Sequence, residues 1–220
     1  MEIMRKNKQK KKHSYIYIFI LIVILAVVLT ITYKNNQEGT LQIESLDENL
    51  IIFIDNQRES SQQDINPSFD LEEGKHTIVI SKDRFWPWIK DVNIKKQTTS
   101  KIQPFFIPQN TSGLLIGETD PEYTRIISLF QKDITATSTL ANIPNENLSF
   151  KESITAIDYY KNRQDVVIIS SGDGIYALEI ISNNIQNFQP IYRGKNPIFV
   201  KKDSSSIYVL DDNNLMLVNY

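Results

Sequence analysis

The chain contains no cysteine, and this absence excludes disulfide bonds and every metal centre that depends on thiolate ligands. Histidine is almost as scarce, with 2 residues in 220. His13 lies in a basic N-terminal segment, and His76 lies in a strand pattern where a sheet residue is expected. We therefore predict that the chain has no metal site and no cofactor.

Sequence patterns of catalysis are missing as well. No serine stands in a G-x-S-x-G turn, and no glycine-rich loop precedes a helix. Asp173 and residues 211–214 lack the spacing and the final glutamate of an EF-hand loop, so hairpin turns explain them better than calcium binding. Glu72 and Glu73 adjoin a turn glycine and are expected in solvent. These absences predict a protein that is not an enzyme.

Charge is distributed unevenly along the chain. The net charge is −2, but the first twelve residues are strongly basic and the remainder is acidic. The basic segment contains Arg5, Lys6, Lys8, Lys10, Lys11 and Lys12. A topology signal, contact with anionic lipid and contact with nucleic acid are three interpretations of this segment. The topology signal is favoured, because an uncharged segment follows at once, and no nucleic-acid partner is predicted.

Residues 15–33 form a long hydrophobic run without a single charge. As a helix the run would be roughly 28 Å long, close to the thickness of a bilayer's hydrocarbon core. Tyr15, Tyr17 and Tyr33 stand near its ends, where aromatic rings favour the membrane interface. We predict an N-terminal transmembrane helix in contact with the lipid bilayer; a cleaved signal peptide is the alternative.

The positive-inside rule gives this predicted helix an orientation. Residues 1–14 would be a cytoplasmic tail, and residues 34–220 would lie outside the cytoplasm. The predicted location is therefore the cell membrane, with a single pass.

The segment 39–108 is patterned as a small antiparallel β-sandwich. Alternating or β-branched runs between turn residues predict short strands. They fall at residues 40–44, 50–54, 77–80, 89–94 and 100–107. Pro104 and Pro108 indicate that the last strand is an edge strand or ends there.

Four segments of this region resemble the PEGA family. They are residues 39–45 (GTLQIES), 52–56 (IFIDN), 71–82 (LEEGKHTIVISK) and 85–88 (FWPW). The sequence departs from the family pattern where Asn56 and Arg84 replace glycines and residues 46–49 (LDEN) replace the Pro-Glu-Gly-Ala tetrad. The resemblance implies a non-catalytic module of the cell envelope and brings no catalytic residues.

The aromatic tetrad at residues 85–88 offers the one candidate contact site. Phe85, Trp86 and Trp88, if exposed, would stack on a glycan or a protein partner. Alternatively, they cover the core of the sandwich where Pro87 turns the chain.

Residues 109–150 are predicted to be a linker that contains one helix. Asp120 and Pro121 form a good helix start, and an apolar face continues to Phe130. We therefore expect a short amphipathic helix over residues 121–132.

Residues 151–220 contain two groups of three strand patterns. Their spacing of about 41 residues is typical of propeller blades. Two units are too few to close a propeller, so a blade-like antiparallel sheet is predicted.

Together, these patterns predict a mainly β, membrane-anchored envelope protein without enzymatic activity. It would bind an envelope protein or a glycan. A passive spacer at the cell surface and an envelope hydrolase are the alternative functions.

Overall fold

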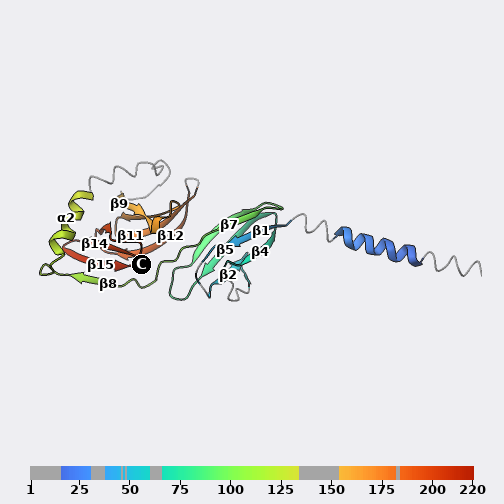
Figure 1. Ribbon diagram of the computed structural model, residues 1–220, viewed down its shortest axis with the longest axis horizontal. Coiled ribbons are helices and arrows are strands. Elements are labelled where there is room, and N and C mark those ends of the chain that lie inside the picture. Colours follow the sequence, from blue (N-terminus) through green and yellow to red (C-terminus); the bar gives the residue numbers. More distant parts are fainter. Residues whose placement is uncertain are drawn as a thin grey trace, which may run out of the picture. The chain divides into compact units, whose positions relative to one another are not determined.

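The computed structural model describes residues 16–30, 38–45, 47, 49–59, 66–133, 154–181 and 184–220. The described chain is mainly β (Figure 1), but the predicted fold class is wrong in its N-terminal transmembrane helix. The six basic residues of the N-terminal segment, Tyr15, Tyr33 and residues 134–153 lie outside the described ranges, so predictions about them stay predictions.

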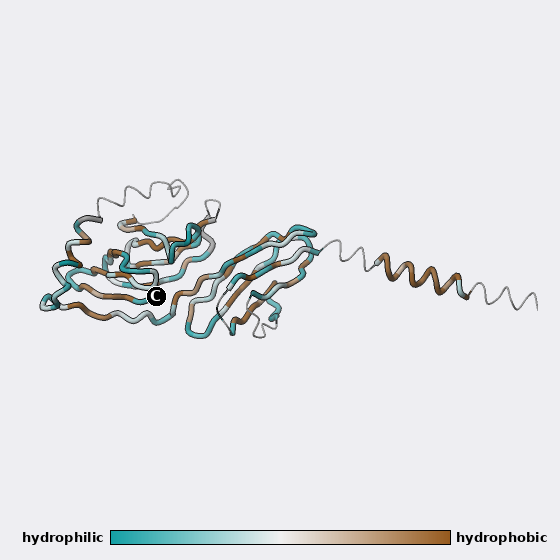
Figure 2. Tube along the Cα trace, viewed as in Figure 1, coloured by the Kyte–Doolittle hydropathy of each residue, from teal (hydrophilic) through white to brown (hydrophobic). Residues whose placement is uncertain are grey.

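The prediction of a transmembrane helix is wrong for the structure described. Within the described ranges, the N-terminal helix covers residues 16–30. No helix in the described ranges is long and apolar enough to cross a bilayer. The helix is nevertheless strongly hydrophobic (Figure 2), and its large apolar side chains are exposed.

The chain divides into two compact units that are interleaved in sequence. Unit 1 comprises Met1–Glu44, Asn66–His76 and Val92–Ile102, and unit 2 comprises Ser45–Ile65, Thr77–Asp91 and Gln103–Tyr220. The boundaries predicted at 39–108, 109–150 and 151–220 therefore stay predictions.

Unit 1 contains a three-stranded sheet in the order β4-β1-β7. Its strands are β1 (Glu38–Ile43), β4 (Ser68–Glu72) and β7 (Thr99–Ile102). β1 pairs antiparallel with β4 and parallel with β7. Alternate residues of β1 are buried, Leu41 and Ile43 fully so, because successive side chains point to opposite faces of a strand.

A second sheet has the order β3-β2-β5-β6. Its strands are β2 (Ile51–Ile54), β3 (Gln57–Glu59), β5 (Gly74–Ser81) and β6 (Trp88–Ile94). A tight turn joins β2 to β3, and Asp55 and Asn56 both have positive φ there (50° and 66°). Aspartate and asparagine tolerate this conformation, which explains why no glycine is needed in the turn.

Unit 2 contains two four-stranded sheets, and the resemblance of the C-terminal region to propeller blades stays a prediction. The first has the order β12-β11-β10-β9, which is a simple meander. Its strands are β9 (Ile154–Tyr159), β10 (Val166–Ser171), β11 (Gly174–Ile181) and β12 (Asn184–Arg193). Every residue of β10 is buried, as expected for an apolar run that is covered on both faces.

The second sheet has the order β13-β14-β15-β8 and takes one strand from earlier in the sequence. β13 (Ile198–Lys201), β14 (Ser206–Asp211) and β15 (Asn214–Asn219) form a meander, and β8 (Gly113–Ile116) joins the free side of β15. We call these four strands sheet D. Helix α2 (Tyr123–Asp133) lies beside it in Figure 1.

Helix α2 confirms the prediction of a short amphipathic helix. The Asp120 carboxylate accepts a hydrogen bond from the backbone N–H of Glu122 at 2.8 Å and so caps the helix start. Ile126 and Phe130 are buried against Val200 and Tyr208 of sheet D. This packing places the apolar face of the helix where the sequence pattern predicted it.

The strand predicted over residues 100–107 ends early, because β7 stops at Ile102. The next residues form a buried extended segment that contains Pro104, Phe105 and Ile107. Proline lacks the N–H of a ladder residue, and side chains satisfy this backbone instead. The Arg163 guanidinium donates to the carbonyls of Gln103 and Pro104 at 2.9 and 3.3 Å.

Candidate functional site

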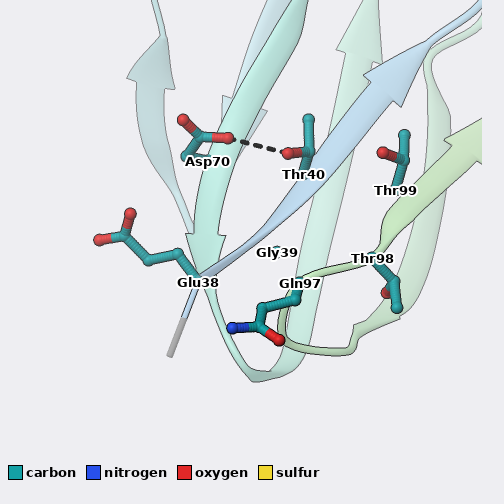
Figure 3. Close-up of a pocket in the computed structure, with 7 residues that line it drawn as sticks. All are labelled: Glu38, Gly39, Thr40, Asp70, Gln97, Thr98 and Thr99. Atoms are coloured by element: carbon teal, nitrogen blue, oxygen red, sulfur yellow. Dashed lines mark hydrogen bonds between the residues drawn. The ribbon is translucent and has the colours of Figure 1, made fainter. Parts of the chain in front are cut away.

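The outward face of the unit 1 sheet is built from polar side chains. Thr40 on β1 lies directly opposite Asp70 on β4 and Thr99 on β7, so the three form one row across the sheet. Figure 3 shows this row, with the Thr40 hydroxyl donating to the Asp70 carboxylate over 2.9 Å. The neighbouring row contains Ser68, Gln42 and Lys101.

A recess opens at one end of this face. It encloses about 400 Å³, within the usual range for small-molecule sites. Its lining consists of Glu38, Gly39, Thr40, Asp70, Gln97, Thr98 and Thr99 (Figure 3). None of these residues has a large apolar side chain, so the recess offers hydrogen bonds rather than apolar contacts.

The turn between β6 and β7 forms one wall of the recess. Gln97 has a φ of 57°, and its backbone N–H donates to the Glu38 carbonyl at 2.8 Å. The Thr98 carbonyl accepts from the N–H of Thr40 at 2.9 Å. Gly39 permits this close approach, because a Cβ there would lie 2.2 Å from the carbonyl oxygen of Lys95.

The recess is rich in hydrogen-bond acceptors and carries negative charge. Glu38 and Asp70 contribute carboxylates, and Glu72 lies directly opposite Glu38 on the next strand. Hydroxyl groups such as that of Thr99 both donate and accept. The arrangement can therefore hold a ligand with many hydroxyl or amino groups, and it disfavours an anionic one.

Nothing in the described ranges forms a metal centre. No group of three or more histidine, aspartate or glutamate side chains is placed to hold an ion there. His76 has its Nε2 atom 2.8 Å from the Glu72 carbonyl oxygen.

Phe85 and Trp86 of the predicted contact site are half-buried. Phe85 packs edge-on against Phe106, with ring centroids 6.4 Å apart, and the Lys82 ammonium lies 4.4 Å from its centroid. The backbone N–H of Trp86 donates to the Ile107 carbonyl at 2.9 Å. Its indole Nε1 is buried and has no hydrogen-bond partner among the described residues.

Trp88, the third predicted contact residue, is completely buried. Its Nε1 donates to the Glu179 carboxylate at 2.9 Å. The same carboxylate accepts from Lys90 Nζ at 2.7 Å and from Asn187 Nδ2 at 2.6 Å. We call these four residues the Glu179 cluster. The indole of Trp88 thus forms a buried hydrogen bond inside unit 2. A ligand role for the tetrad at residues 85–88 remains a prediction.

The recess and the Glu179 cluster were both missed by sequence reasoning. The alternation of β1 does carry a signal for the recess, since Glu38, Thr40 and Gln42 all fall on one face. No local signal marks Glu179, because its partners come from distant segments of the chain.

We find no protein-family model, curated protein or solved structure that matches the chain. The fold and the recess therefore define only a class: a mainly β protein with two four-stranded sheets in unit 2 and an open polar sheet face in unit 1. The resemblance to the PEGA family stays a prediction.

Proposed function

We propose that the chain is a non-enzymatic binding protein of the cell envelope, and that the recess in unit 1 binds a glycan. The polar row of Asp70, Thr40 and Thr99 at the recess supports this proposal most directly. Carboxylates and hydroxyls spaced along neighbouring strands match the hydroxyl groups of a sugar chain. The envelope assignment comes from the PEGA resemblance.

The charge of the recess narrows the class of glycan. Glu38 and Asp70 would repel uronic acids and sulfated sugars, and they would attract amino groups. The expected ligand is therefore a neutral or amino-bearing oligosaccharide. A protein partner is the weaker choice, because interface cores are enriched in aromatic side chains and the recess lining has none.

Calorimetric titration of the full chain with neutral, amino-bearing and anionic oligosaccharides tests the proposal. The affinity for the first two should fall about tenfold or more in Asp70→Asn and Thr99→Val, since each loses a hydrogen bond to a ligand. Asp83→Asn is the matched control, because Asp83 is exposed and lies outside the recess. Equal binding by all variants, or preference for the anionic sugar, contradicts the proposal.

A passive spacer is the second candidate function, and the Glu179 cluster favours it. The cluster fixes the start of β6 to the sheet of β11 and β12 through buried hydrogen bonds. A spacer would keep its biological role when the recess is altered by Asp70→Asn but lose it when Glu179 is replaced. The opposite pattern would favour glycan binding.

A further inference from the structure

Strand β8 is an open, hydrophobic edge of sheet D. Among the described strands it pairs only with β15. Leu114 and Leu115 are 67% and 64% exposed, and they point to opposite faces because they are adjacent in a strand. Edge strands are normally protected by charge, proline or a bulge, and β8 has none of these.

The hydrogen bonds of sheet D show which backbone groups of β8 face outward. The Asn219 N–H donates to the Ser112 carbonyl at 3.3 Å. These two residues continue the register that pairs Gly113 with Val218. Hydrogen-bonded and non-hydrogen-bonded pairs alternate along an antiparallel ladder. Leu114 therefore directs its N–H and C=O toward β15, whereas Gly113 and Leu115 direct theirs to the open edge.

The pairing of β15 with β14 independently gives the same alternation of backbone directions along β15. The Tyr220 N–H donates to the Ser205 carbonyl at 2.9 Å, in register with the pairing of β14 and β15. Val218 and Met216 thus face β14 with their backbone groups. Leu217, the neighbour of Leu114, is left to bond β8.

We propose that β8 pairs antiparallel with β8 of a second copy of this chain, about a twofold axis at Leu114. Gly113 then lies opposite Leu115 of the other copy, and the outward N–H and C=O groups of both residues are satisfied. Leu114 meets its own counterpart in a non-hydrogen-bonded pair, where side chains are closest. The two copies of sheet D become one continuous sheet, which is an isologous contact.

The charges that flank β8 favour a second copy as the occupant. Acidic residues follow the strand, at Glu118 and Asp120, and uncharged Asn110, Thr111 and Ser112 precede it. In the proposed antiparallel register Glu118 lies opposite Asn110 of the other copy, so no two carboxylates face each other. A parallel pairing would place Glu118 beside Glu118. β8 can therefore pair with β8 of a second copy in the antiparallel direction, whereas the parallel direction is disfavoured by charge repulsion.

The small size of the contact predicts a weak, reversible dimer. β8 has 4 residues, so the contact is smaller than the roughly 1,200–2,000 Å² of stable interfaces. Association should therefore depend on protein concentration. It does not involve the recess in unit 1, so glycan binding and dimerisation can fail independently.

Disulfide trapping tests the proposed register of β8 against β8 of the second copy. The chain has no native cysteine, so only the introduced thiols can form a disulfide. In Leu114→Cys the two thiols face each other across the axis, at the Cα separation of about 4.5 Å that suits a disulfide. Leu115→Cys is the matched control of nearly equal exposure. Its thiols lie diagonally, at about 7–8 Å. Mild oxidation should link the first variant at least about tenfold faster. Equal rates would overturn the proposal.

Charge variants test the same axis without a covalent bond. Leu114→Lys and Leu114→Glu should each raise the dimer dissociation constant about tenfold or more in sedimentation equilibrium, because like charges meet. An equimolar mixture should associate again as a Lys–Glu pair. Any association through the exposed helix of residues 16–30 would be the same in all samples, so it would not produce a difference between the variants.

Ile89→Lys changes an exposed apolar residue elsewhere and should leave the dissociation constant unchanged. Circular dichroism checks that each variant is folded. A wild type that stays monomeric at every concentration, or a mixture that fails to associate, would contradict the proposed dimer.

Discussion

The carboxylate of Asp70 in unit 1 is exposed and accepts a hydrogen bond from the Thr40 hydroxyl, whereas the carboxylate of Glu179 in unit 2 is 1% exposed and accepts from three donors. Burying a charge is unfavourable unless it is paired and hydrogen-bonded, so the three donors are what makes Glu179 compatible with the interior. Asp70 has no such constraint. The contrast indicates that polar groups stabilise the fold in unit 2 and remain available to a ligand in unit 1.

Glu179→Ala is the strongest test of this contrast. It leaves the Lys90 ammonium, the Trp88 indole and the Asn187 amide without their acceptor, and breaking a buried pair on one side costs about 3–5 kcal/mol. Urea denaturation followed by tryptophan fluorescence measures the loss. Asp70→Asn should change the free energy of unfolding by less than about 1 kcal/mol. Similar losses in both variants would remove the distinction between the two regions.

Gly39→Ala should have the second-largest effect. A Cβ at this position would lie 2.2 Å from the Lys95 carbonyl oxygen, so the turn that walls the recess must move. We expect a loss of about 1–3 kcal/mol together with weaker glycan binding. Gly117→Ala is the matched control, because the atom nearest to its added Cβ would be 3.9 Å away. Thermal unfolding of the two variants should differ clearly.

A third prediction concerns the dependence of unit 2 on pH. Burial and the neighbouring Asp211 raise the pKa of Tyr192 to about 12. Burial of Asp211 opposes the hydrogen bonds from Asn196, Lys195 and Tyr192, but these bonds prevail and hold its pKa below the usual value. The contribution of Tyr192 to the free energy of unfolding is complete below pH 10 and is lost as the pH rises toward 12. The contribution of Asp211 is complete above about pH 4 and is lost as the pH falls below that value.

The measurement is the urea midpoint as a function of pH. Tyr192→Phe should remove the part of the alkaline decline that lies between pH 10 and 12, and Asp211→Asn should reduce the decline in acid. Unchanged slopes in these variants would show that this second polar contact of unit 2 contributes no pH-linked stability.

Lys101→Ala should have the smallest effect. Lys101 Nζ lies 2.8 Å from the Glu44 carboxylate, but both side chains are about half exposed. Exposed ion pairs of this kind contribute roughly 0–1 kcal/mol, and salt screens them. Calorimetric unfolding at low and high salt should therefore hardly distinguish this variant from the wild type. A loss comparable to that of Glu179→Ala would refute the assignment of stabilising polar contacts to unit 2.

Periodic patterns in the sequence identified the strands and helices in which the alternation of apolar and polar residues shows which face is buried. The β-branched run of β5 and the apolar face of α2 are examples. β4 was missed because Ser68, Asp70 and Glu72 have low strand propensity, and β8 because four residues carry too little pattern. The prediction of a transmembrane helix from the hydrophobic run at residues 15–33 is wrong, because no helix in the described part of the chain is long and apolar enough to cross a bilayer.

The two candidate sites differed in how far the sequence could reveal them. The polar face of β1 follows from alternation, but its row with Asp70 and Thr99 requires the strand order β4-β1-β7. The Glu179 cluster joins β6 to β11 and β12, which are far apart in the sequence. Such non-local pairings follow from the fold as a whole and not from any local pattern.

The position of β8 beside β15 has a consequence for biosynthesis. During translation β8 and α2 leave the ribosome long before β13, β14 and β15, so sheet D is incomplete until Asn214–Asn219 has been made. Meanwhile Ile126 and Phe130 have no Leu215 to cover them. A nascent chain stalled before this strand would expose apolar surface and attract chaperones, and pairing over so great a sequence distance should make the final step slow.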